Sequence, residues 1–136
     1  MSKICYLDID GVLFVYGTYN FSKAACNNLK KLLEQVPDLK IVICSSWRHL
    51  GMDSVKKTLD FHGIDKDRII GCTGNEGPPR GLEVRLWMDR NPSVTNYVII
   101  DDEQEFPGLE DHLVRPNGYV GLTSDDIKKA IEILNK

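Results

Sequence analysis

The chain has 136 residues, of which 42% are hydrophobic and 27% are charged, values that are ordinary for a soluble globular protein with a substantial core. We therefore expect one domain spanning residues 1–136. The formal net charge of −3 does not indicate a strongly basic nucleic-acid-binding surface, although a local basic patch is compatible with it.

The chain carries no recognisable N-terminal targeting signal and no apolar run of membrane-spanning length, so we expect a cytoplasmic protein with no membrane partner. Its four cysteines are widely spaced and include no C-x-x-C pair. Buried, reduced thiols are therefore favoured over a zinc site or a disulfide. The cysteines are Cys5, Cys26, Cys44 and Cys72.

The first segment is an apolar run that ends in two aspartates and a glycine, KICYLDIDGVL over residues 3–13. The apolar part predicts a strand buried on both faces. Because side chains alternate along a strand, Asp8 and Asp10 share one face while the chain stays extended. Two carboxylates at a strand end are costly unless a cation lies between them, which favours a metal site. The alternative is that they only cap the strand and start a turn at Gly11.

A short excursion, a helix and a second strand follow. Residues 14–20 predict a small flap, in the form of a tight hairpin, above the end of the first strand. Ser22 suits an N-cap, and apolar residues at helical spacing as far as Val36 predict the first helix. An apolar run over residues 40–44 predicts a second buried strand, which ends at Ser45.

The second half of the chain continues to alternate strands and helices. We expect a helix over 53–61, a strand over 68–72, a helix that begins at Arg80, a strand over 97–100, a short strand over 112–114 and a closing helix over 124–134. Thr123 and Asp126 predict a capping box at the start of the last helix. This order indicates an α/β fold, a three-layer α/β/α sandwich with a mainly parallel, Rossmann-like sheet.

In such a sheet the ligand site lies beyond the carboxyl ends of the strands. Three pairs of polar residues follow predicted strands at that edge, namely Asp8 and Asp10, Ser45 and Ser46, and Asp101 and Asp102. Mg²⁺ prefers oxygen ligands and neutralises phosphate charge that would repel an attacking carboxylate. The set therefore indicates magnesium-dependent phosphoryl transfer, with one aspartate as nucleophile and a second carboxyl group as proton donor.

The same stretches resemble motifs of the haloacid dehalogenase-like (HAD) superfamily. LDIDGVL at 7–13 is similar to its motif I, IVICS at 41–45 to motif II and VIIDD at 98–102 to motif IV. The resemblance covers nearly the whole chain. The stretches at 45–48, 80–87 and 121–123 further resemble small bacterial and phage HAD domains with relatives among nucleic-acid repair proteins. The resemblance implies a HAD fold, here without a cap domain, because no segment between the motifs is long enough for one.

The resemblance also implies a role for each site residue. Asp8 would be the nucleophile and a magnesium ligand. Asp10 would be the general acid and base and would bind the metal through its backbone carbonyl. Both would contact the phosphoryl group, which Ser45 would hold. Asp101 would bind Mg²⁺ directly, and Asp102 would bind it directly or through water.

Two assignments around the site stay open. The motif III cation is expected to be Arg80, which opens a helix and would also bind phosphate; Lys56 and Lys57 are alternatives, although mid-helix lysines are typical of a solvated face. Trp47 and Arg48 are candidate substrate contacts at the entrance. Otherwise, Trp47 packs against the sheet edge and Arg48 forms a surface ion pair.

The leading interpretation is a magnesium-dependent phosphatase that acts through an aspartyl-phosphate. With only the flap as a lid, the site should be open and suited to a large substrate, such as a phosphorylated nucleic-acid end or protein, rather than only a small molecule. One alternative is a nucleotide or polynucleotide 3′/5′-phosphatase in nucleic-acid repair. Another is a non-catalytic phospho-receiver or binding module, which would not need a proton donor at Asp10.

Overall fold

The computed structural model describes residues 2–18, 20–74, 80–102 and 105–136. Its centre is a five-stranded sheet in the order β5-β4-β1-β6-β7, in which all neighbouring strands are parallel. The strands are β1 Ser2–Leu7, β4 Leu39–Ile43, β5 Ile69–Cys72, β6 Val94–Ile100 and β7 Leu113–Val114. β1 lies in the middle and is fully buried from Ile4 onward, as expected of a parallel strand that is covered on both faces.

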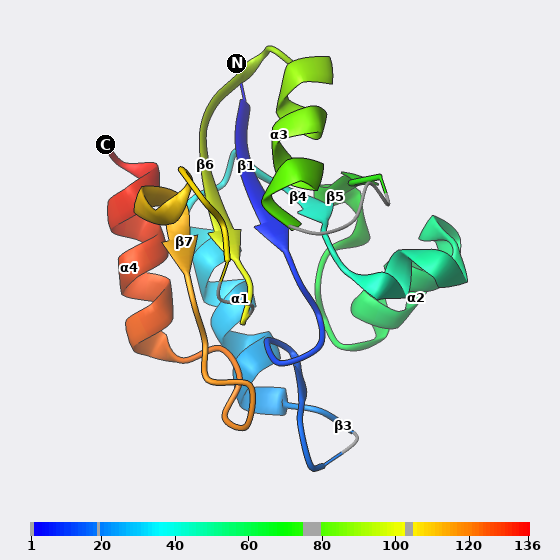
Figure 1. Cartoon of the computed structure of the whole chain (residues 1–136). Helices are drawn as coiled ribbons and strands as arrows, with labels where there is room; N and C mark the ends of the chain where they lie inside the picture. The colour runs from blue at the N-terminus through cyan, green and yellow to red at the C-terminus, as the bar shows by residue number, and fades with distance from the viewer. Residues whose placement is uncertain (1, 19, 75–79, 103–104) are drawn as a thin grey trace.

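Four α-helices flank the sheet (Figure 1), namely α1 Lys23–Gln35, α2 Met52–Phe61, α3 Arg80–Arg90 and α4 Ser124–Leu134. Residues of α1, α2 and α4 pack with Cys5 and Leu7, on one face of β1. Val84 of α3 packs with Ile4 and Tyr6, on the opposite face. The predicted three-layer α/β/α sandwich is therefore confirmed.

The direction in which strands are added to the sheet reverses beside β1. The chain first adds β4 and β5 on one side of β1 and then crosses over to add β6 and β7 on the other. Ligands of open parallel sheets bind at such a switch point, outside the carboxyl ends of the strands. Leu7 and Ile100, the last residues of β1 and β6, are partners in the ladder. Asp8 and Asp101 therefore leave the sheet side by side.

The predicted flap is an antiparallel hairpin of β2 (Phe14–Val15) and β3 (Asn20–Phe21). Tyr19, which falls in the predicted flap, lies outside the described residues, as do residues 75–79 of the loop before α3. Among the described residues no larger insert separates the elements of the sandwich. The expected absence of a cap domain therefore agrees with the described part of the chain.

The helix starts follow the sequence signals closely. The side chain of Ser22 accepts a hydrogen bond from the backbone N–H of Ala25, and Thr123 and Asp126 form both halves of a capping box. A 3₁₀-helix, η1 (Ser46–Leu50), was not predicted. The predicted strand over 112–114 begins one residue later, because His112 ends another 3₁₀-helix, η3 (Glu110–His112).

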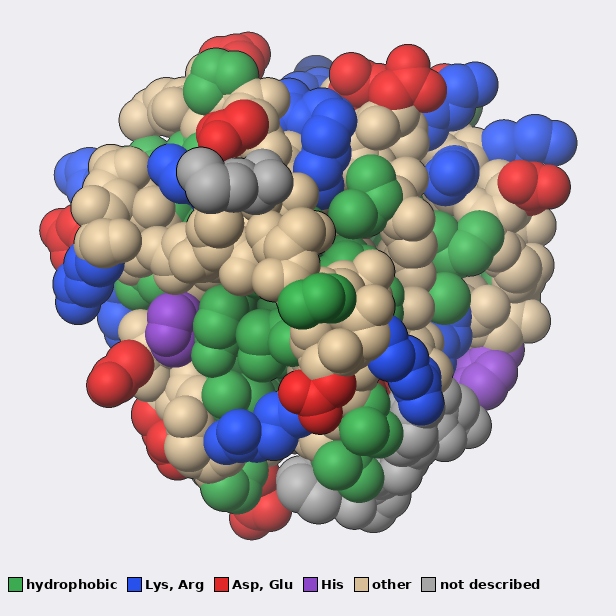
Figure 2. All heavy atoms as spheres, turned by 90° about the horizontal axis from the view of Figure 1, so that it is seen from above, with side chains coloured by type: hydrophobic (Ala, Val, Ile, Leu, Met, Phe, Trp, Pro, Cys, Tyr) green, Lys and Arg blue, Asp and Glu red, His purple; other side chains and the backbone are tan. Residues whose placement is uncertain are grey.

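All four cysteines are free thiols, as predicted, but only Cys5, Cys26 and Cys44 are buried, and Cys72 is partly exposed. In the described part of the chain, no helix combines the length and the apolar character needed to cross a membrane. At the end of the sheet where β1 begins, lysine and arginine side chains are interspersed with acidic ones (Figure 2). That face therefore carries both signs of charge.

Candidate active site

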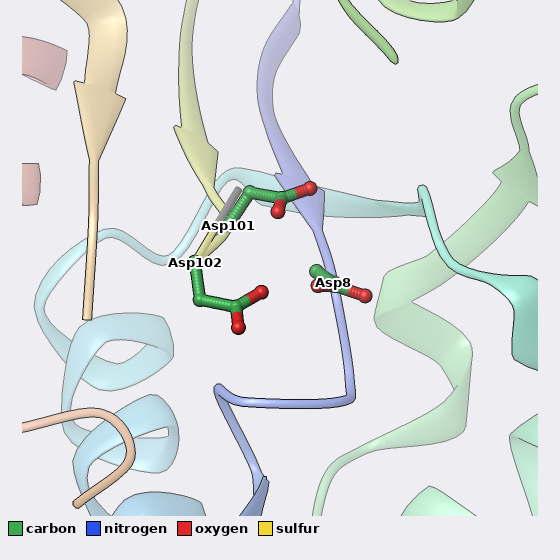
Figure 3. A group of neighbouring side chains, drawn as sticks. All are labelled: Asp8, Asp101 and Asp102. Carbon is green, nitrogen blue, oxygen red and sulfur yellow. The ribbon is translucent and has the colours of Figure 1, made fainter. Parts of the chain in front are cut away.

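Three carboxyl groups meet at the carboxyl ends of β1 and β6 (Figure 3). One oxygen each from Asp8, Asp101 and Asp102 lies within 4.8 Å of the others. Asp8 and Asp101 are buried, with 3% and 0% of their surface exposed, and Asp102 is partly exposed. A cluster of carboxylate oxygens is the donor set that Mg²⁺ prefers, so these residues fit the expected metal.

Arg80 reaches into this cluster from the first turn of α3. Its Nη1 lies 2.9 Å from Oδ2 of Asp101 and 3.3 Å from Oδ2 of Asp8. The two alternatives for the motif III cation, Lys56 and Lys57, line a separate surface hollow. Arg80 is therefore the one of the three candidate motif III cations that the structure places beside Asp8 and Asp101.

The electrostatics of the cluster favour a further positive charge. Burial raises the pKa of the Asp8 carboxyl above its usual range, the charge of Asp101 raises it further, and Arg80 opposes both effects. Burial lowers the pKa of Arg80, but Asp101 and Asp8 more than reverse this, so Arg80 stays charged. One guanidinium thus contacts two of the three clustered carboxyl groups, and a bound cation would relieve the excess of negative charge.

Asp10 lies in the same crevice but outside the three-acid cluster. Its Oδ1 accepts a hydrogen bond of 2.8 Å from Nε1 of Trp47. Trp47 also packs against the flap, with its ring centroid 5.7 Å from that of Phe14 and 5.4 Å from that of Phe21. Trp47 therefore packs against the flap rather than against the sheet edge that we expected, and its indole orients a predicted catalytic carboxylate. A substrate contact of Trp47 stays a prediction.

The two serines that follow β4 have different surroundings. Ser45 is fully buried, and its hydroxyl caps η1 by accepting a hydrogen bond from the backbone N–H of Trp47. Ser46 is exposed and lines the crevice. The phosphate contact predicted for Ser45 stays a prediction, and the structure adds Ser46 as a second candidate.

Arg48 is held inside the fold. Its Nη2 lies 3.3 Å from Oε2 of Glu83, and the two side chains are only 9% and 5% exposed. The other carboxylate oxygen of Glu83 accepts a hydrogen bond of 3.1 Å from Thr73. The ion pair that we expected at the surface is therefore buried, because Arg48 pairs with a glutamate on the buried side of α3. A substrate contact of Arg48 stays a prediction.

Sequence reasoning missed Tyr16, which closes one side of the crevice. From the flap, its hydroxyl donates a hydrogen bond of 2.6 Å to Oδ2 of Asp102. Gly11, with φ +79°, allows the chain to turn close to this pair, because a Cβ at Gly11 would collide with the Asp102 carboxyl. The crevice has a volume of about 240 Å³ and is lined by Asp8, Asp10, Tyr16, Ser46, Arg80 and Asp102.

Comparison with known proteins gives one match. A family profile described as "HAD domain in Swiss Army Knife RNA repair proteins" matches residues 4–127. A search of curated proteins and a search of solved structures found no match. The matched region runs from β1 into α4 and includes the whole crevice.

Proposed function

The chain belongs to the family of HAD domains in Swiss Army Knife RNA repair proteins, and from this membership and the geometry of the crevice we propose that it is a magnesium-dependent phosphatase. It would hydrolyse a phosphomonoester through an aspartyl-phosphate. One observation carries the proposal: a buried aspartate at the switch point of the sheet has an arginine at 3.3 Å and the oxygens of two further acids within 4.8 Å. A second carboxylate, Asp10, follows it by two residues.

The environment of Asp8 selects the oxygen that would attack phosphorus. Oδ1 accepts a hydrogen bond of 2.8 Å from the backbone N–H of Ile9, which fixes the carboxylate. Oδ2 faces Arg80 at 3.3 Å. Oδ2 is therefore the nucleophile that we propose, and Arg80 lies where it can contact the phosphoryl oxygens during transfer.

The reaction then takes two steps. In the first, Oδ2 of Asp8 forms a bond to phosphorus while the ester P–O bond breaks, and Asp10 gives its proton to the departing oxygen. In the second, water attacks the phosphorus of the aspartyl-phosphate, Asp10 takes up a proton from that water, and the Asp8–phosphorus bond breaks to release inorganic phosphate. Trp47 would hold Asp10 in the orientation that both steps need.

When bound, Mg²⁺ would be held by Asp8, Asp101 and Asp102, and it would neutralise the charge of the phosphate. The backbone carbonyl of Asp10 is a further predicted ligand. This assignment rests on the donor set of the cluster and on the surplus of carboxyl groups over cations there.

A nucleic-acid end is the substrate that we favour. The flap is a short hairpin, so a large phosphorylated substrate can reach the crevice, and the family description names RNA repair proteins. The chain would then be a polynucleotide 3′- or 5′-phosphatase. A phospho-receiver is less well supported, because a receiver does not need the oriented carboxylate of Asp10.

The first experiment measures phosphate release from para-nitrophenyl phosphate with and without Mg²⁺. We expect magnesium-dependent turnover in the wild type and its loss in Asp8→Asn and Asp10→Asn, with Asp125→Asn, an exposed position on α4, as the matched control. Full activity of Asp8→Asn would overturn the mechanism. A stable phosphate on Asp8 after incubation with acetyl phosphate, without turnover, would favour the receiver.

The second experiment compares substrates. We expect a larger kcat/KM for 3′- or 5′-phosphorylated oligonucleotides than for a sugar phosphate, because the open crevice does not enclose a small molecule. An equal kcat/KM for the sugar phosphate would contradict a preference for large substrates.

A further inference from the structure

A second hollow lies beyond the flap, between α1 and the end of α2. It has a volume of about 440 Å³, larger than the crevice at Asp8. We call it the aromatic-basic groove, and its main lining residues are Phe21, Lys23, Asn27, Lys30, Phe61 and His62. Nothing in the phosphatase mechanism uses this groove.

Aromatic rings form one side of the groove. The Phe61 side chain is 84% exposed, which packing of the core does not explain. Its ring meets the edge of His62 at a centroid distance of 5.1 Å, and His62 stacks on Phe21 at 4.2 Å with an angle of 26° between the planes. The groove therefore offers an exposed ring supported by two others, which is a platform for a flat aromatic ligand.

The charge of the groove is positive. Lys23 and Lys30 both line it from α1, and its described lining includes no acidic residue. Alternating rings and cations are what proteins use to bind single-stranded nucleic acid, in which bases stack on side chains and phosphates face lysine or arginine. An acidic peptide would use the lysines but would leave the rings without a partner.

The groove and the crevice of the candidate active site share no lining residue, but two aromatic rings connect them. Phe21 lies 5.4 Å from Trp47 between ring centroids, and Trp47 donates the hydrogen bond to Asp10. One indole ring therefore separates the groove from the proposed general acid. A polymer with its end in the crevice would pass the flap at Trp47 and enter the groove.

We propose that the aromatic-basic groove binds the nucleotides that adjoin the phosphorylated end of a single-stranded nucleic acid. Phe61 provides the stacking surface for a base, and Lys23 and Lys30 contact the backbone phosphates. The inference rests on the proposed phosphatase function, because that function places the phosphorylated end of the nucleic acid in the crevice at Asp8. Binding in the groove is measurable without turnover.

The test measures binding of a fluorescein-labelled, 3′-phosphorylated hexauridylate by fluorescence anisotropy, with para-nitrophenyl phosphate hydrolysis measured on the same proteins. We expect Phe61→Ala to weaken hexauridylate binding about tenfold, because stacking on one ring is lost. Lys23→Gln should reduce the slope of log affinity against log salt by about 0.7, as expected for one lost phosphate contact. Ile70→Ala and Lys129→Gln, exposed positions outside the groove lining, are the matched controls.

The outcomes separate this inference from the proposed function. Unchanged hexauridylate binding in Phe61→Ala overturns the groove assignment, whether or not the protein hydrolyses para-nitrophenyl phosphate. Weakened binding in a protein without phosphatase activity supports the groove and contradicts the proposed function. Displacement of hexauridylate by hexaglutamate at equal concentration, with Phe61→Ala leaving hexaglutamate binding unchanged, would assign the groove to acidic peptides and overturn the inference.

Discussion

At the scale of single residues, the orientation of Asp10 depends on one hydrogen-bond donor, the indole N–H of Trp47 in η1. The Trp47 indole N–H lies 2.8 Å from its carboxylate, and a hydrogen bond to a charged group contributes about 1.5–3 kcal/mol. Because the proposed mechanism needs Asp10 aimed at the departing oxygen, we expect Trp47→Phe to lower kcat about 10- to 100-fold. Steady-state kinetics on para-nitrophenyl phosphate measure this. Trp87→Phe, which alters an indole packed against Tyr6, is the control and should keep the wild-type kcat.

Tyr16 makes a similar contact with a proposed metal ligand. Burial and the neighbouring Asp102 carboxylate raise the pKa of Tyr16, so its hydroxyl stays protonated and donates to Asp102. Loss of such a supporting contact typically lowers metal affinity 10- to 100-fold, so we expect Tyr16→Phe to weaken Mg²⁺ binding by about that factor. Isothermal titration calorimetry measures the affinity without turnover. Tyr119→Phe removes a hydroxyl from the ring next to Tyr16; an equal loss of affinity there would contradict a specific role for the Tyr16 hydroxyl.

At the scale of elements, the buried pair of Arg48 and Glu83 ties η1 to α3. Removal of one partner from a buried ion pair leaves an uncompensated charge and typically costs about 3–5 kcal/mol. We therefore expect Glu83→Gln to lower the free energy of unfolding by that order, measured by urea denaturation. Glu132→Gln, at an exposed position of α4, should change it by less than about 0.5 kcal/mol.

A double variant separates the ion pair from packing. Arg48→Met with Glu83→Leu removes both charges and keeps apolar volume, so it should be more stable than Glu83→Gln alone. The contrary outcome is a double variant whose loss of unfolding free energy equals the sum of the losses in Arg48→Met and Glu83→Leu. The two residues would then not act as a unit, and the losses would come from packing.

The elements were largely predictable, because their signals are local. The apolar runs that predict β1 and β4 are the strands themselves. The capping residues Ser22 and Thr123 lie directly before the helices that they start. η1 was missed because Ser46–Leu50 has no apolar period and depends on the Ser45 cap. The contacts of Tyr16 with Asp102 and of Trp47 with Asp10 join residues 86 and 37 positions apart. Only the assembled sheet and flap bring such pairs together, so no local pattern could predict them.

At the scale of the whole molecule, the strand order explains why the acids converge. Asp8 and Asp101 are 93 positions apart in the chain, yet they follow neighbouring strands whose last residues are ladder partners. α3, which crosses back between β5 and β6, carries Arg80 to the same edge. The crevice thus requires the complete sandwich, and partial unfolding should abolish metal binding together with activity.

The core as a whole also sets an alkaline limit to stability. Burial raises the pKa of Cys5 from its ordinary value of 9.0 to about 12, and it raises the pKa of Cys26 and Cys44 as well. Above pH 9 the unfolded chain therefore releases thiol protons that the folded chain keeps. Because the folded state then binds more protons, the free energy of unfolding must fall as pH rises from 9 towards 12.

The Cys5 thiol alone should contribute about 1 kcal/mol to that fall between pH 9 and 10. Cys5→Ala removes one such group, so its free energy of unfolding, measured in urea at pH 8, 9 and 10, should fall less steeply than that of the wild type. Val98→Ala removes volume from a buried position on β6 without removing a titrating group. It should lower stability at every pH and keep the wild-type slope. Equal slopes in all three proteins would show that Cys5 titrates alike in the folded and unfolded states, contrary to its complete burial in the centre of β1.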